Sequence, residues 1–166
     1  VPKGATYINF RSPEVGQNAR QAASALLYTA LLKDDVNEFA YSAMLAGLSF
    51  DFYKHAQGIS LRVTAYNDKQ SVLLQKLLAV AANPAFDQAR FDNIRKDMIR
   101  ALQNHVAAPP SSQAMNDLRE ALLYGEWGEQ ALIAELEQLD MAAVEDYARR
   151  FWDSASAEVM IYGNYA

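Results

Sequence analysis

The segment from Leu31 to Ser49 changes its hydrophobic period at one glycine, and this change constrains the fold more than any other feature of the chain. Before Gly47 the apolar residues recur at helical spacing, whereas after it they alternate with polar residues. Residues 19–32 predict an alanine-rich amphipathic helix whose apolar positions lie three and four residues apart. A second helix is expected from Glu38 to Gly47, with Asn37 as its N-cap and Gly47 as the C′ residue that ends it.

Residues 50–66 carry the period of two that is typical of β-strands with one buried face. We expect a β-hairpin here, with its turn at residues 55–58. Asn67 is expected to cap the helix that follows, with Gln70 in the capping-box position three residues later. The strand therefore passes into the next helix with almost no linker.

The second half of the chain is predicted to form successive helices before a final strand at residues 157–162. Asp87 and Asp140 are expected to cap two of these helices. Pro109-Pro110 separates the first of them from a helix that starts at Ser111 or Ser112. The apolar stripe of that helix is expected to face the core; its members are Met115, Leu118 and Leu122.

The order of these elements predicts the fold class. Strands at residues 5–10, 50–66 and 157–162, with helices segregated from them, indicate an α+β fold rather than alternating parallel α/β. We expect a largely antiparallel sheet of about four or more strands, with about six helices packed mainly on one face. At 166 residues and 51% hydrophobic, the chain is expected to form a single domain over residues 1–166.

Composition excludes several functions. The net charge of −5 argues against a nucleic-acid partner, because phosphate neutralisation dominates that binding. No apolar run approaches the roughly 20 residues of a membrane-spanning helix. The chain has no cysteine and so forms no disulfide, which is compatible with the periplasm and with the cytoplasm and leaves localisation open.

Four segments together resemble the insulinase, or pitrilysin, family of zinc metallopeptidases. They are LLKDDVNEFAYSAMLAGLSFDF at 31–52, AYNDKQ at 65–70, RFDNIRKDMIRALQN at 90–104 and YGN at 162–164. More narrowly, they look like the middle, or third, domain of these peptidases, and the opening Val1-Pro2-Lys3 resembles the start of that domain. The similarity runs through essentially the whole chain in the right order, so it is more specific than a single motif.

The resemblance implies an insulinase/mitochondrial-processing-peptidase-like repeat within a larger enzyme. Family members are built as a clamshell of four related α+β domains that closes around a peptide. Zinc belongs to the first domain, on a helix with His-x-x-Glu-His, and the third domain repeats the fold without the metal. The resemblance therefore implies three partners for this chain: the other domains of the parent peptidase, a peptide substrate, and zinc held only in the parent's first domain.

The histidines of this chain do not match the catalytic pattern. His55 and His105 are its two histidines, and neither has a second histidine one helical turn away. The predicted helix at 19–32 contains neither His nor Glu. Because a zinc site needs at least three protein ligands, we expect no metal ligand, no catalytic residue and no cofactor in this segment.

Four residues are candidates for contacts of other kinds. His55 and Gln57, at the predicted hairpin turn Lys54–Gly58, are candidates for contact with substrate in the parent's chamber, although a solvated turn histidine is the simpler explanation of His55. Trp127 and Trp152 are candidates for an interdomain surface, where aromatic residues are enriched, although core packing is the simpler reading of each.

The function expected from these observations is that of a noncatalytic domain of an insulinase-like zinc metalloendopeptidase, forming part of the peptide-enclosing chamber and of an interdomain surface. The alternative is a peptidase-inactive insulinase-like scaffold or partner subunit that binds peptides or another subunit. An independent small-molecule-binding domain is a weaker alternative, since the sequence shows no convergent polar site.

Overall fold

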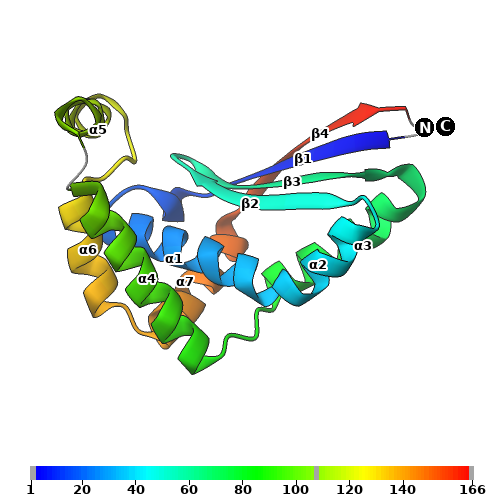
Figure 1. The fold of residues 1–166 in the computed structure, drawn as a ribbon, viewed down its shortest axis with the longest axis horizontal. Helices are drawn as coiled ribbons and strands as arrows, with labels where there is room; N and C mark the ends of the chain where they lie inside the picture. The colour runs from blue at the N-terminus through cyan, green and yellow to red at the C-terminus, as the bar shows by residue number, and fades with distance from the viewer. Residues whose placement is uncertain (1–2, 107–108, 165–166) are drawn as a thin grey trace.

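The computed structural model describes residues 3–106 and 109–164, and at positions 38, 40, 67, 68, 105 and 106 it describes the backbone alone. The described chain contains a four-stranded antiparallel sheet with helices against one face (Figure 1). Its strands are β1 (Lys3–Arg11), β2 (Ser49–His55), β3 (Gly58–Tyr66) and β4 (Ser156–Gly163), in the spatial order β2-β3-β1-β4. The expected α+β class is confirmed. The resemblance at Val1 and Pro2 lies outside the described residues.

The two faces of the sheet differ in burial. In β1, Ile8 and Phe10 are buried, whereas Tyr7 and Asn9, which alternate with them, are partly exposed. Central strands β1 and β3 pair along their full lengths, from Lys3 opposite Tyr66 to Arg11 opposite Gly58. The period of two therefore assigns one apolar face to the core and leaves the other face open.

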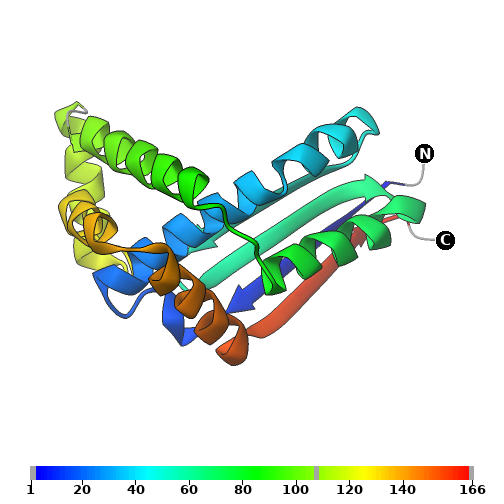
Figure 2. The ribbon, with the colours of Figure 1, turned by 90° about the horizontal axis from the view of Figure 1, so that it is seen from below.

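All the described helices except α5 (Pro110–Leu122) lie in one layer beneath the sheet, seen from below in Figure 2. The others are α1 (Ala19–Asp35), α2 (Asn37–Leu45), α3 (Asn67–Ala82), α4 (Gln88–Val106), α6 (Glu129–Gln138) and α7 (Met141–Ser154), with a 3₁₀ turn η1 (Pro13–Val15). The described residues thus contain seven α-helices where about six were expected. Helix α1 packs against β2, α4, α6 and α7, so it is the centre of the core.

Tyr28 on α1 links three parts of the core. Its hydroxyl donates to the carbonyl of Ala81 at the end of α3, at 2.7 Å, and accepts from the indole Nε1 of Trp152 on α7, also at 2.7 Å. The Trp152 ring packs edge-on against Phe10 of β1, with ring centroids 4.8 Å apart. Burial raises the pKa of Tyr28, so its hydroxyl keeps the proton that it donates.

The corner between α1 and α2 confirms one expected boundary and corrects another. Gly47 has φ +75° and follows α2 in a Schellman arrangement, in which Leu48 N–H donates to the Ala43 carbonyl at 3.0 Å. Asn37 is not the N-cap, because it is the first residue of α2 and the N-cap position belongs to Val36. Val36 is buried, so its packing, rather than a polar cap, sets this corner.

Helix α3 begins at Asn67, with Tyr66 in the N-cap position. The side chain of Asn67, and hence its expected capping role, lies outside the described residues. Gln70 is buried, and its Nε2 donates to the carbonyls of Gly4 at 3.2 Å and Val63 at 3.4 Å. Gln70 therefore ties α3 to the two central strands.

Helix α5 contradicts the expectation that its apolar stripe faces the core. Met115, Leu118 and Leu122 are all exposed, and α5 has no buried residue. The helix is attached through its polar side instead: Asn116 donates to Glu129 at 2.8 Å. Figure 1 shows α5 standing apart from the other helices. Periodicity predicted the helix and its stripe, but it does not specify which neighbour covers the stripe.

The packing of α1 predicts the effect of a charge at Leu27, which is fully buried. Leu27→Asp is expected to lower the free energy of unfolding by about 3–5 kcal/mol, because it removes a buried aliphatic side chain and introduces an unpaired carboxylate. Urea unfolding followed by circular dichroism measures this loss.

Leu118→Asp is the matched control, because Leu118 is about half exposed on α5. Leu118→Asp is expected to lower the free energy of unfolding by no more than about 1 kcal/mol. Equal unfolding midpoints for Leu27→Asp and the unsubstituted chain would show that α1 does not pack as described.

Candidate functional site

The open face of the sheet carries a row of polar side chains that crosses all four strands. Tyr53 of β2 lies opposite Ser60 of β3, Ser60 lies opposite Asn9 of β1, and Asn9 lies opposite Glu158 of β4. We call these four residues the polar row. They share one face because each pair is directly opposite in register.

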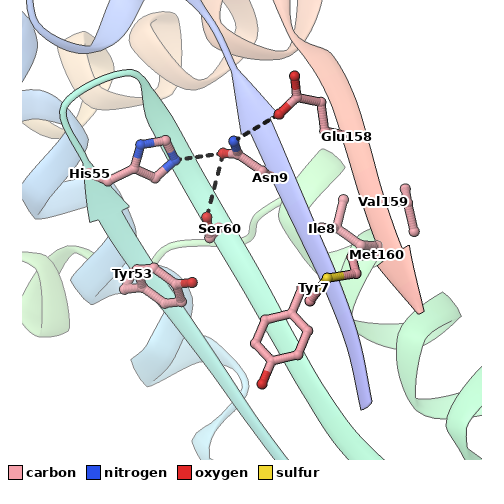
Figure 3. A pocket seen from close by; sticks show the side chains of 9 residues that line it. All are labelled: Tyr7, Ile8, Asn9, Tyr53, His55, Ser60, Glu158, Val159 and Met160. Carbon is pink, nitrogen blue, oxygen red and sulfur yellow. Dashed lines mark hydrogen bonds between the residues drawn. The ribbon is translucent and has the colours of Figure 1, made fainter. Parts of the chain in front are cut away.

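A cavity of about 430 Å³ lies over the polar row (Figure 3). Tyr7 and Met160, which pair in the adjacent row, line one side of it, and His55 lines the side nearest the hairpin turn. Ile8 and Val159 complete the lining. The cavity therefore combines aromatic and thioether surface with hydroxyl, amide, imidazole and carboxylate groups.

Five residues from three strands and the hairpin turn form a closed hydrogen-bonded ring beside this cavity. His55 Nε2 lies 2.6 Å from Asn9 Oδ1, and Asn9 Nδ2 donates to a Glu158 oxygen at 3.4 Å. Arg11 binds the other Glu158 oxygen at 2.8 Å and also donates to the side-chain oxygen of Gln57. The backbone N–H of Gln57 donates to His55 Nδ1 at 3.3 Å, which closes the ring.

The ring fixes the protonation state of His55. Its Nδ1 accepts from the Gln57 N–H, so Nε2 carries the proton and donates to Asn9 Oδ1. Burial lowers the pKa of His55, and the positive charges of Lys54 and Arg11 lower it further. His55 is therefore neutral at neutral pH.

The hairpin turn is held against the body of the protein rather than protruding from it. Ser12 N–H donates to the Gln57 carbonyl at 3.1 Å. Gly125 has φ +82°, and a Cβ added there would lie 2.9 Å from the Ala56 carbonyl oxygen. Only glycine fits this close approach without displacing backbone. The turn is consequently a rigid edge of the cavity.

The structure places both sequence-predicted chamber residues in this region, since His55 lines the cavity and Gln57 belongs to the ring. Sequence reasoning missed Asn9 and Glu158 as their partners. The alternation in residues 5–10 and 157–162 assigns both to polar positions, but it gives no register between strands that are about 150 residues apart in sequence.

The other candidate residues lie away from the cavity. Trp127 donates its indole N–H to the Gly16 carbonyl at 3.2 Å, and Trp152 donates to Tyr28; both are half-buried against the core. Their interdomain role stays a prediction. The side chain of His105, near the end of α4, lies outside the described residues.

Within residues 3–106 and 109–164, no three His, Cys, Asp or Glu side chains are grouped so that they could hold a metal ion. The expectation that this segment binds no zinc stays a prediction. No helix in the described part of the chain is long and apolar enough to cross a membrane.

The ring predicts a pH dependence of stability that involves His55. The folded chain holds the pKa of His55 below its ordinary 6.5, so the unfolded chain takes up the proton first as pH falls. The contribution of neutral His55 to the free energy of unfolding is therefore complete above pH 6.5. This contribution declines as the pH falls from 6.5 towards the pKa of His55 in the folded chain. In urea unfolding from about pH 7.5 to about pH 5, His55→Gln is expected to lose less stability than the unsubstituted chain.

His105→Gln is the control for this measurement, because it also removes one titrating imidazole. If the two variants flatten the pH profile equally, the effect does not come from the ring.

Comparison with known proteins agrees with the resemblance seen in the sequence. Residues 1–135 match the family model described as the middle or third domain of peptidase M16. Human insulin-degrading enzyme is 33% identical over 164 residues, which are 99% of this chain and 16% of that protein. A Schizosaccharomyces pombe protein named as a zinc protease is 27% identical over 165 residues, covering 99% of this chain and 17% of its own length.

The fold agrees as well. The crystal structure of pitrilysin matches with a TM-score of 0.89 at 18% sequence identity, covering 99% of this chain and 17% of that one. The chain thus spans about one sixth of the length of these relatives. The family model covers most of the chain, and the expected family is confirmed: this chain belongs to the middle, or third, domains of M16 peptidases.

Proposed function

We propose that this chain is the noncatalytic third domain of an insulinase-type zinc metalloendopeptidase, and that the open face of its sheet forms part of the wall of the peptide chamber. Residues 1–166 act as one domain of that larger protein. The observation that carries the proposal is the cavity over the polar row, which brings hydrogen-bonding groups and tyrosine rings together on a rigid sheet.

The composition of the open face suits a peptide. An extended peptide presents amide groups and side chains of varied size, so its binding surface needs both polar and apolar contacts. Mutual hydrogen bonds hold Asn9, Ser60 and Glu158 in place as the floor of the cavity. The Tyr53 hydroxyl supplies a polar group at the edge of this floor, and Tyr7 and Met160 supply apolar surface. A sheet holds these groups in fixed positions, which limits the entropy lost on binding.

Three further surfaces suit contact with sister domains. Large apolar side chains are exposed on α2, on α5 and on the face of β4 opposite the cavity, where Val159 pairs with Ile8 and Ile161 with Thr6. The exposed members are Tyr41, Met44 and Leu45; Met115, Leu118 and Leu122; and Val159 and Ile161. Apolar surface gathered in this way marks sites of association, and in the proposed parent it is covered by the other domains.

Zinc in the proposed parent is held outside this segment. The Schizosaccharomyces pombe relative is named as a zinc protease, which supports a metal in the parent's first domain. This chain contributes rigid surface, whereas the nucleophile and the metal come from elsewhere in the protein. A peptidase-inactive scaffold or partner subunit would use the same surfaces, and it would differ by lacking the first-domain zinc helix.

Variants of the full-length parent test the chamber role. His55→Ala and Gln57→Ala are expected to change the KM for peptides by about two- to tenfold, because each removes a hydrogen bond worth about 0.5–1.5 kcal/mol from the cavity edge. Zinc content should stay unchanged, and metal analysis of the same preparations measures it.

Gln103→Ala is the control for these variants, because Gln103 is exposed on α4, away from the sheet. Unaltered KM values across several peptides would remove the hairpin turn from the substrate path. Loss of zinc in either variant would show that this segment belongs to the metal-binding half.

The isolated chain tests whether zinc binding and catalysis belong to another part of the parent protein. Purified without chelator, it is expected to contain no stoichiometric zinc and to leave fluorogenic peptides uncleaved, because it lacks the paired histidines of a zinc helix. One tightly bound zinc per chain, together with zinc-dependent cleavage, would overturn the proposal.

A further inference from the structure

The polar groups at the floor of the cavity are already bound to one another. Asn9 Oδ1 faces His55 at 2.6 Å and accepts from Ser60 Oγ at 3.5 Å, and Asn9 Nδ2 donates to Glu158. Both ring nitrogens of His55 are engaged within the hydrogen-bonded ring. The floor therefore offers few free donors or acceptors to a polar ligand, and binding there would have to break existing hydrogen bonds.

The cavity also has no net charge to offer. Among the described residues that line it, Glu158 is the one formally charged group, because His55 is held neutral. Arg11 compensates Glu158 at 2.8 Å. A charged side chain that gives up part of its water on contact here gains no unpaired opposite charge among the lining residues in return, and that exchange is unfavourable.

The walls, in contrast, offer contact surface. Tyr53 on β2 and Met160 on β4 are 40% and 58% exposed, and they stand on opposite sides of the polar row's central strands. Tyr7 lies between them, and its ring already carries a cation–π contact, with the Arg62 guanidinium 5.4 Å from the ring centroid. Tyrosine rings and a flexible thioether adapt to apolar and aromatic groups of differing shape.

We propose that this cavity accepts one uncharged apolar or aromatic side chain of an extended peptide and discriminates against charged side chains. The inference rests on the proposed function, and it names the peptides that the site selects. The saturated floor and compensated charge make charged groups unfavourable, while Tyr7, Tyr53 and Met160 supply the contact. A volume of about 430 Å³ accommodates a single large side chain.

Titration of the chain with capped amino acids tests this specificity. The ligands are the N-acetyl amides of phenylalanine, leucine, lysine and glutamate, followed by NMR of the Met160 methyl group and the Tyr53 ring. The phenylalanine and leucine compounds are expected to shift both signals. The lysine and glutamate compounds are expected to bind at least about tenfold more weakly.

Substitutions locate the binding. Tyr53→Ala and Met160→Ala should each weaken binding of the phenylalanine compound by about three- to tenfold, because each removes one wall of the cavity. Tyr162→Ala is the matched control: Tyr162 lies on the same face of β4, two residues from Met160, and does not line the cavity. Met160→Glu adds a second carboxylate beside Glu158 and should shift the preference towards the lysine compound.

The outcomes separate this inference from the proposed function. Equal affinity for all four compounds, or binding unaffected by Tyr53→Ala and Met160→Ala, would overturn the specificity but not the peptide contact. Shifts caused by an oligopeptide but by no capped amino acid would also overturn it, since backbone recognition would then dominate. The absence of shifts with both kinds of ligand would overturn the specificity and the chamber role together.

Discussion

The structure depends on how closely helix α1 approaches its neighbours. Ala22, Ala23 and Ala25 are completely or almost completely buried, so the helix backbone comes near both the sheet and the surrounding helices. Tyr28 then reaches across this layer to fix α3 and α7 through its hydroxyl. Because the apolar positions of the central strands β1 and β3 are covered from this one side, the opposite face of the sheet is left available for polar residues.

Local sequence signals account for much of the fold. Alternation in residues 50–66 predicted the hairpin, Gly47 ended α2 through its positive φ, and Asp87 and Asp140 capped α4 and α7 as expected. Each of these features is set by residues within a few positions of one another. Local hydrogen bonding and backbone conformation are therefore sufficient to predict them.

The site could be predicted only in part, because it depends on register between distant strands. His55 and Gln57 were recognised from a turn, but their partners Asn9 and Glu158 become partners only after β1 has paired with both β3 and β4. Burial is equally hard to predict at α5. The helix and its apolar stripe form as expected, but the stripe does not pack against the core. Periodicity defines which residues share a face, whereas tertiary packing decides what that face meets.

The place of β4 at the edge of the sheet has a consequence for solubility. Its outer backbone edge is unpaired in the described structure, and Val159, Met160, Ile161 and Tyr162 are all exposed. Such strands recruit further strands and lead to aggregation unless a charge interrupts them. Glu158 is the one charged residue of this strand, so the same carboxylate that binds Arg11 and Asn9 in the ring is also the charge that interrupts the apolar edge.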